Sequence, residues 1–219
     1  MEPADASTAS PHFTVASHSL VAAKLSLLRS DRTPTELFRR TLQELSVLLL
    51  AEASREWGTV PIEVTTPLQT CAGTALVKPV VLVPILRAGL GMADGMLRLL
   101  PDAQVGHLGL YRDEVTLRPV TYYSRLPEDL AHAHVLLLDP MLATGHSACA
   151  AAAILKSHGA VSVQFICAVA CSAGIAQLHK EHPDIPIITA AVDPELNSVG
   201  YIVPGLGDAG DRYFGTRPT

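Results

Sequence analysis

Residues 135–147, VLLLDPMLATGHS, place four aliphatic side chains before an acid, a loop of small residues and an alanine-rich segment. Four consecutive aliphatic residues at this point favour a strand that is covered on both faces of a parallel sheet. The loop then leads into the start of a helix, where backbone N–H groups and hydroxyls can bind an anion. The stretch therefore predicts a strand, a phosphate loop and a helix.

This local pattern has a second interpretation. Asp139, at the end of the strand, is placed to accept hydrogen bonds from sugar hydroxyls. In an ordinary strand-to-helix turn, however, Asp139 and Thr144 would serve only as caps, and the stretch alone favours the two interpretations equally.

Composition and charge narrow the class of protein. A chain of 219 residues is long enough for one domain with a sizeable core. Its net charge of −5 argues against a general nucleic-acid binder, which is usually basic. No apolar run approaches the ~20 residues that a membrane-spanning helix needs, so no membrane partner is expected.

The N-terminal residues contain neither Lys nor Arg and no apolar segment, so they do not resemble a signal or transit peptide. We expect a disordered tail over residues 1–17 and a single domain over residues 18–219. The four cysteines show no C-x-x-C spacing, and three lie in alanine- or valine-rich surroundings. Buried reduced thiols are the expectation for these three, and the cytoplasm is the expected location.

Helical and strand patterns alternate along the chain. Helices are predicted over residues 20–28, 35–53, 92–100, 148–158 and 175–181. Strands are predicted over residues 60–64, 79–85, 104–111, 119–123, 135–138, 161–170 and 185–192. This alternation predicts an α/β fold with a largely parallel sheet, whose strand-end loops meet along one edge.

Two further loops could meet the phosphate loop at that edge. Arg87 follows a buried strand on a glycine-flanked turn, where its guanidinium could bind a diphosphate, although a surface Arg on a tight turn is the better interpretation of this loop alone. Residues 200–211 have too many glycines for a helix or strand. Because Tyr201, Ile202 and Leu206 would be costly to leave in water, this segment is expected to fold as a loop that lines a pocket.

Together these segments resemble uracil phosphoribosyltransferase, a family of the type I phosphoribosyltransferases. The resemblance rests on VPILRAGLGM at residues 83–92, YRDEVTLRPV at 111–120, DPMLATGHS at 139–147 and GYIVPGLGDAGDRYFGT at 200–216. Residues 24–40 also resemble the leading helices of that family. The fold that the resemblance implies has a central sheet flanked by helices, a β-arm and a C-terminal base-binding loop region.

The implied reaction transfers the phosphoribosyl group of 5-phospho-α-D-ribose 1-diphosphate to N1 of uracil, giving UMP and diphosphate in pyrimidine salvage. The resemblance assigns catalytic roles to Arg112 and Asp208. The residues implied to bind phosphoribosyl diphosphate are Arg87, Arg112, Asp139, Pro140, Met141, Leu142, Ala143, Thr144, Gly145, His146, Ser147 and Asp208. Those implied to bind uracil are Tyr201, Ile202, Gly207, Asp208 and Ala209.

Cofactor and partners follow from the same resemblance. Mg²⁺ is implied near Asp208, bound through water, and the arm over residues 112–125 would close over the site. A homo-oligomer, dimer or tetramer, is implied, and GTP is a candidate activator as in some relatives.

Two departures leave alternatives open. His146 stands where the family usually has a second glycine, but related transferases accept bulky residues there, so we expect the turn not to need one. The second departure is the stretch ACSA at residues 170–173, which stands where the family commonly has Pro-Glu after the strand and would reshape one wall of the pocket. Pro140 stands where many type I relatives have a second acid, as it does in the uracil enzymes, and therefore favours uracil over other bases. The alternatives are a type I phosphoribosyltransferase for another base and a non-catalytic uracil or nucleotide sensor of the same fold.

Overall fold

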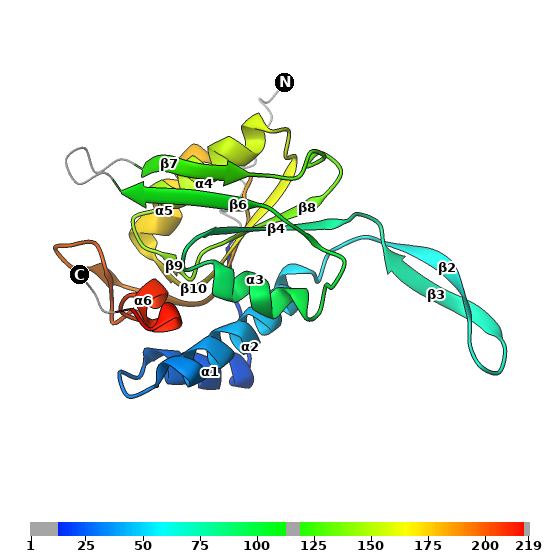
Figure 1. Ribbon diagram of the computed structural model, residues 1–219, viewed down its shortest axis with the longest axis horizontal. Helices are drawn as coiled ribbons and strands as arrows, with labels where there is room; N and C mark the ends of the chain where they lie inside the picture. The colour runs from blue at the N-terminus through cyan, green and yellow to red at the C-terminus, as the bar shows by residue number, and fades with distance from the viewer. Residues whose placement is uncertain (1–12, 113–118, 217–219) are drawn as a thin grey trace, which may run out of the picture.

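The structure, a computed structural model, describes residues 13–112 and 119–216. A sheet with the strand order β1-β11-β10-β8-β4-β6-β7 forms its centre (Figure 1). These strands are β1 (Phe13–Val15), β4 (Val80–Leu86), β6 (His107–Arg112), β7 (Pro119–Arg125), β8 (His134–Leu138), β10 (Ser162–Cys171) and β11 (Ile187–Asp193). Every neighbouring pair is parallel except β6 and β7, and the short strands β5 (Gln104–Val105) and β9 (Met141–Leu142) pair with β4 and β10. The predicted α/β architecture with a largely parallel sheet is confirmed.

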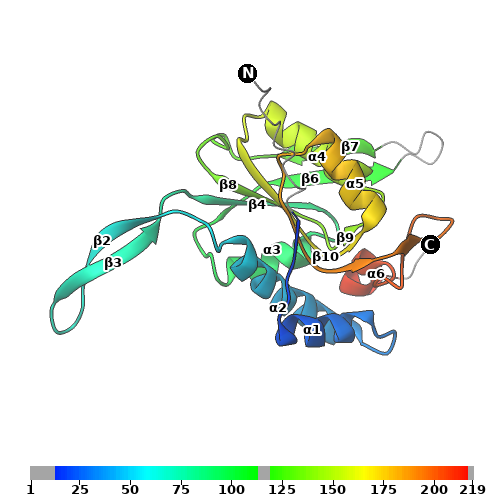
Figure 2. The ribbon, with the colours of Figure 1, turned by 180° about the vertical axis from the view of Figure 1, so that it is seen from behind.

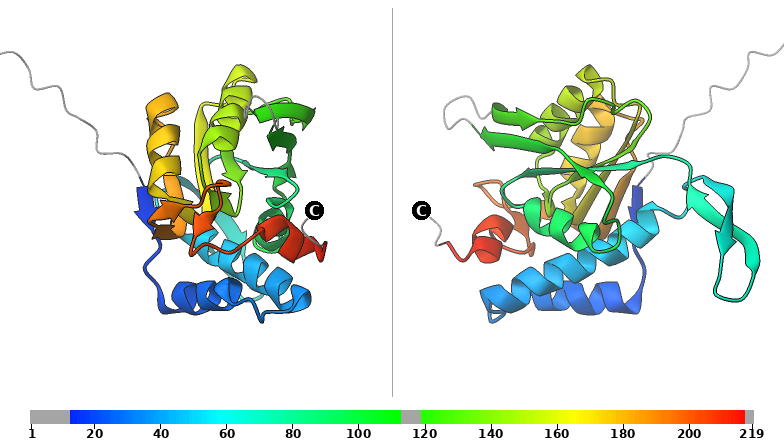
Figure 3. Two further views of the ribbon diagram at one scale, coloured as in Figure 1. Left: turned by 90° about the vertical axis from the view of Figure 1, so that its left-hand side faces the viewer. Right: turned by 45° about the vertical axis from the view of Figure 1, so that its right-hand side comes forward.

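Alternate residues of the central strands build two cores, one on each face of the sheet. In β8, Leu136 and Leu138 pack in the core that contains α1, α2 and α3, whereas Val135 and Leu137 pack in the core that contains α4 and α5. Figure 3 shows α1 and α2 on one side of the sheet and α4 and α5 on the other. Because successive side chains of a strand point to opposite faces, only an uninterrupted aliphatic run can fill both cores.

Five of the six helices in the described residues largely match their predicted positions, and the sixth, α6, was not predicted. The six are α1 (Ser19–Arg29), α2 (Thr35–Ala53), α3 (Leu90–Leu97), α4 (His146–Ser157), α5 (Ser172–Glu181) and α6 (Ala209–Phe214). Helix α3 ends three residues before the predicted end at 100, because its last turn tightens: the amides of Arg98 and Leu99 bond to the carbonyls of Gly95 and Met96. In the part of the chain that the structure describes, no helix has the length and apolarity of a membrane span.

Strand β1 corrects the prediction of a disordered tail over residues 1–17. Residues 13–15 pair in parallel with β11, and the amide of Ala16 donates to the carbonyl of Thr189 at 2.8 Å. The His18 side chain then caps α1 by accepting from the amide of Leu20. A strand of three residues that depends on a partner far along the chain leaves no local pattern to detect. Residues 1–12 lie outside the described part of the chain.

Two antiparallel hairpins leave the central sheet. The strands β2 (Thr59–Thr65) and β3 (Thr70–Leu76) form a separate two-stranded sheet that projects from the body (Figures 1 and 2). The sequence predicted a strand over residues 60–64 but not its partner β3. The second hairpin, β6 and β7, confirms the predicted hairpin strand over 119–123. Residues 113–118 of the predicted mobile arm, and the side chain of Arg112, lie outside the description.

Residues 200–211 were predicted to contain neither helix nor strand, and this was wrong, because they include β13 and the start of α6. Strands β12 (Glu195–Leu196) and β13 (Ile202–Val203) pair with each other, and α6 follows. Four glycines of this region, Gly200, Gly205, Gly207 and Gly215, lie in turns and have positive φ. Within α6 itself the one glycine is Gly210. The carboxylate of Asp208 starts α6 by accepting from the amide of Asp211 at 2.8 Å.

Candidate active site

The phosphate loop (residues 139–147) begins where β8 ends. The Asp139 carboxylate turns the chain by accepting from the amide of Met141 at 3.1 Å. The carbonyl of Pro140 accepts from the amides of Ala168 and Val169, both at 3.0 Å, so the loop is attached to β10. The loop is therefore held on two sides before it reaches α4.

Asp139 sits in an environment that favours its neutral form. Burial raises the pKa of its carboxyl group to about 7, and the hydrogen bond from the Met141 amide opposes this only in part. A half-buried acid at the end of a central strand can accept from sugar hydroxyls when ionised and donate to them when protonated. Either form suits the ribose role expected for Asp139.

The turn into α4 depends on Gly145. Its φ is +82°, and a Cβ at this position would lie 2.8 Å from the carbonyl oxygen of Gly174. His146 is the first residue of α4 and exposed, and its Nδ1 lies 3.2 Å from Oγ1 of Thr144. The expectation that the turn needs no glycine at position 146 is therefore confirmed. The amides of the first helical turn have no partner within the helix and are available to an anion.

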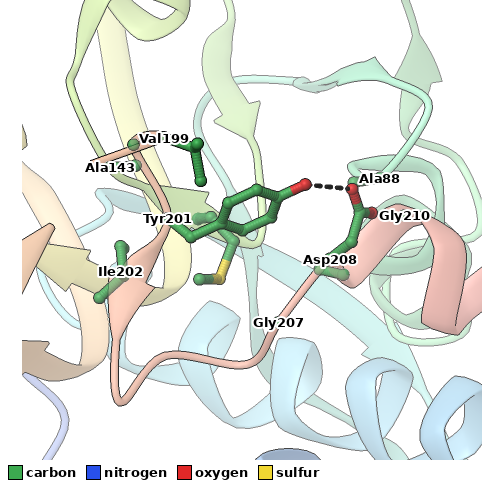
Figure 4. Close-up of a pocket in the computed structure, with 11 residues that line it drawn as sticks. Ala88, Ala143, Val199, Tyr201, Ile202, Gly207, Asp208 and Gly210 are labelled. Atoms are coloured by element: carbon green, nitrogen blue, oxygen red, sulfur yellow. Dashed lines mark hydrogen bonds between the residues drawn. The ribbon is translucent and has the colours of Figure 1, made fainter. Parts of the chain in front are cut away.

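The C-terminal segment (residues 195–210) faces the phosphate loop. The side-chain oxygen of Asn197 shapes its turn by accepting from the amides of Val199 and Tyr201, at 3.1 and 2.9 Å. A cavity of about 320 Å³ opens between the two segments (Figure 4). It is lined by Ala88, Met141, Ala143, Val199, Gly200, Tyr201, Ile202, Gly207, Asp208, Ala209 and Gly210.

All five residues expected to bind uracil line this cavity, together with Met141 and Ala143 of the phosphate loop. The other phosphate-loop residues do not line it. Ala88, Val199, Gly200 and Gly210 line it without having been predicted individually. Small or apolar side chains of this kind carry no chemical signal in a sequence. The glycine-rich composition was the only indication, because small residues let a ligand approach the backbone closely.

Asp208 stands between the cavity and α6. One carboxylate oxygen accepts from the amide of Asp211, and the other accepts from the Tyr201 hydroxyl at 3.2 Å (Figure 4). Burial, and next the negative charge of Asp208, raise the pKa of Tyr201, so the phenol remains a donor. The two side chains thus form one polar edge of an otherwise largely apolar cavity.

Arg87 lies on the loop after β4, and its peptide bond with Leu86 is cis. Its Nη2 donates to Oδ1 of Asp211 at 3.2 Å, and its guanidinium lies 5.7 Å from the ring centroid of Phe214. The Arg87 side chain is 57% exposed, whereas that of Asp211 is 15% exposed. Most of the guanidinium donors therefore remain accessible to a ligand. No sequence pattern linked Arg87 with α6, because Arg87 and Asp211 are 124 residues apart.

Mg²⁺ was predicted near Asp208. Among the described residues, no three His, Cys, Asp or Glu side chains group together as a metal site. Both oxygens of Asp208 already accept one hydrogen bond, and a carboxylate oxygen has further lone pairs. Mg²⁺ commonly keeps several waters and is held by one or two carboxylates with substrate phosphates. Asp208 therefore fits a Mg²⁺ ion that is held through water and through the substrate.

Solved structures of other proteins have the same fold. A protein from Aquifex aeolicus, 38% identical, matches with a TM-score of 0.89 over 94% of this chain and 100% of its own. A hypoxanthine-guanine phosphoribosyltransferase from Bacillus anthracis, only 11% identical, matches with a TM-score of 0.50 over 72% of this chain and 80% of its own. The fold is that of the type I phosphoribosyltransferases, as predicted.

Sequence comparison identifies the family to which the chain belongs within the type I phosphoribosyltransferases. The sequence model of the uracil phosphoribosyltransferase family matches residues 15–216. Uracil phosphoribosyltransferases from Acholeplasma laidlawii and Dictyoglomus turgidum are 51% and 53% identical over 203 and 204 residues, which cover 93% of this chain and 98% and 99% of theirs. The chain belongs to the uracil phosphoribosyltransferase family.

We expect Gly145→Ala to weaken binding of phosphoribosyl diphosphate, measured by calorimetry, by about tenfold or more. The alanine turn is expected to relax in the free protein, so binding must restore the left-handed φ at a cost of about 1–2 kcal/mol, and each 1.4 kcal/mol is a factor of about ten in affinity. Crowding against the Gly174 carbonyl adds to this cost. Gly159→Ala is the matched control, because Gly159 has φ +88° with no atom near its Cβ position. It should lower the melting temperature but leave the affinity unchanged. Equal affinities in both variants would contradict this account.

Asp139 makes the stability of the ligand-free protein depend on pH. Its folded-state pKa, about 7, lies above the ordinary value of 3.8, so the folded state retains a proton that the unfolded state loses. The resulting stabilisation is complete below about pH 4 and is lost as pH rises through 7. Relative to Asp139→Asn, the free energy of unfolding should therefore fall by up to about 1.4 kcal/mol per pH unit over that window. Urea denaturation of both proteins at several pH values measures this difference, and parallel curves would refute the assignment.

Proposed function

We propose that this protein transfers the phosphoribosyl group of 5-phospho-α-D-ribose 1-diphosphate to N1 of uracil, giving UMP and diphosphate, as in pyrimidine salvage. The observation that carries the proposal is the cavity that joins the phosphate loop to the C-terminal segment. It lies next to a helix N-terminus that can bind a phosphate and an exposed arginine that can bind a diphosphate. Membership of the uracil phosphoribosyltransferase family supports the same reaction.

The phosphoribosyl group would occupy the phosphate loop. The amides and hydroxyls of residues 143–147 would hold the 5′-phosphate at the start of α4, and Asp139 would bind the ribose hydroxyls. Arg87 and Arg112 would bind the diphosphate, where negative charge grows as the C1–O bond breaks. Fixed positive charges favour the transition state over the bound substrate, because that charge is larger in the transition state.

Uracil would enter the cavity edge-on to the backbone of the C-terminal segment. Main-chain groups of Ile202, Gly207 and Ala209 would pair with the base, and Tyr201 would cover it. As the C1–N1 bond forms, the N1 proton must leave. Asp208, which lines the cavity, would accept that proton or direct it to solvent.

Mg²⁺, held near Asp208 through water, would neutralise the charge of the diphosphate when bound. The carboxylate of Asp208 has a second task besides the metal, because its hydrogen bonds fix both Tyr201 and the start of α6. We therefore infer that Asp208 organises the metal-binding end and the base-binding end of the site together.

We also propose a homo-oligomer, a dimer or tetramer, and the hairpin of β2 and β3 supports it. Val60, Ile62 and Val64 lie on one face of β2 and are each about two-fifths exposed. An isolated two-stranded hairpin is marginally stable in water, so a second copy of the chain is the natural cover for this face. Sedimentation with and without GTP tests the oligomeric state, and turnover measured with and without GTP tests GTP as a candidate activator.

A cytoplasmic location is proposed because all four cysteines are free and three of them are buried. Burial raises the pKa of Cys149 and Cys167 to about 12, which keeps both as neutral thiols. Unreactive reduced thiols are typical of proteins in a reducing compartment.

The reaction is tested by UMP and diphosphate formation from phosphoribosyl diphosphate, Mg²⁺ and either uracil or cytosine. A backbone N–H cannot become an acceptor, nor a C=O a donor, and cytosine reverses both groups that uracil presents at positions 3 and 4. We expect kcat/KM for uracil to exceed that for cytosine by roughly 10⁴–10⁵, because a mismatch leaves buried groups unpaired. Comparable values or a preference for a purine would contradict the base assignment. Tight binding without turnover would favour the sensor instead.

A further inference from the structure

Arg87 is held by two residues of α6 that have no assigned part in the reaction. Its Nη2 donates to Oδ1 of Asp211 at 3.2 Å, and the ring of Phe214 lies 5.7 Å below the guanidinium. One donor of the five on a guanidinium is used by Asp211. The contact therefore fixes the direction of a long side chain and leaves its remaining donors free for a polyanion.

Helix α6 is a firm support for that contact. The Tyr213 ring is 5% exposed, and its hydroxyl donates to Asp94 and accepts from Gln43, both at 3.0 Å. The guanidinium of Arg212 donates to the carbonyls of Leu206, Leu28 and Ser30. These contacts attach α6 to α1, α2 and α3, so the position of Asp211 is set by the body of the protein.

The same helix reaches the base cavity. Asp208, at its N-terminal cap, binds the Tyr201 hydroxyl, and Asp211 lies three residues further on. The Asp211 side chain is only 15% exposed, so the neighbouring guanidinium and the helix shield its charge from solvent. An unpaired acid next to a diphosphate would repel it, whereas an acid paired with Arg87 orients a positive charge toward it.

We propose that Asp211 is a positioning residue that holds Arg87 ready for the diphosphate of phosphoribosyl diphosphate, with Phe214 as the second contact. It thereby links the diphosphate end of the site to the helix that also carries Asp208. The inference rests on the role proposed above for Arg87. The contact with Asp211 preorganises Arg87, because an arginine that is already ordered loses less side-chain entropy when substrate binds.

The test measures the dissociation constant of phosphoribosyl diphosphate with Mg²⁺ by calorimetry. Ordering one flexible side chain costs about 0.5–1.5 kcal/mol, so Asp211→Ala should raise the dissociation constant about 2- to 12-fold. Asp211→Asn keeps an acceptor oxygen for Arg87 and should give a smaller rise. Thr216→Val is the matched control, because it removes the other side-chain donor to Asp211 and leaves Arg87 in place. It should not change the dissociation constant.

A double-mutant cycle decides whether Asp211 acts through Arg87. In the Arg87→Ala background, Asp211→Ala should cause no further weakening. An equal fold-change in both backgrounds would overturn the proposal, because Asp211 would then act independently of Arg87. Tighter binding in Asp211→Ala would overturn it as well, because the acid would then compete with the diphosphate. Unchanged binding in Arg87→Ala alone would instead reject the diphosphate role of Arg87, and this inference with it.

Discussion

The ion pair between Arg29 and Asp193 determines where the C-terminal half of the site lies. Arg29, the last residue of α1, donates to both carboxylate oxygens of Asp193, at 2.7 and 2.6 Å. Asp193 ends β11 and is 5% exposed. The pair extends to Gly205, whose amide donates to Asp193 at 2.8 Å and whose carbonyl accepts from Arg29 at 3.0 Å. One acid thus joins a strand end, a helix end and the segment that lines the cavity.

The contacts of Asp193 keep its carboxylate charged although the residue is buried. Burial raises the pKa of Asp193, but the hydrogen bonds from Arg29 and the Gly205 amide, with the charge of Arg29, outweigh it and leave the pKa below its ordinary value. The carboxylate is therefore charged at neutral pH, and its stabilising effect is lost only as pH falls through that lowered pKa. Because a buried pair is costly to break from one side, the segment that follows β11 has one strongly favoured course.

The sequence predicted those parts of the site whose structure depends only on residues close by in the chain. Residues 135–138 had to be a central strand because they are aliphatic without interruption, and Asp139 follows as the chain leaves the core. The ion pair escaped prediction because its partners are 164 residues apart. Strand β3 escaped because its small residues, TCAGTAL, show no clear alternation of apolar and polar side chains. Helix α6 was hidden by the glycines around it, since composition does not show which glycines occupy turns.

The cavity therefore depends on contacts between distant segments that no local pattern records. The phosphate loop is set by β8 and β10, whereas the C-terminal segment is set by Arg29, Asp193 and the contacts of Arg212. Removing a support of the C-terminal segment should therefore affect ligand binding there more than it affects binding at the phosphate loop.

The most direct test compares uracil and phosphoribosyl diphosphate in Arg29→Met, with the melting temperature as a check on folding. Leaving Asp193 unpaired should displace the C-terminal segment and raise the KM for uracil about tenfold or more, at about 1.4 kcal/mol per factor of ten. The dissociation constant of phosphoribosyl diphosphate should change less, because the phosphate loop and Arg87 lie outside the displaced segment and, of the residues assigned to this substrate, Asp208 alone lies on it. A folded variant with an unchanged KM for uracil, or with both ligands weakened equally, would contradict the account.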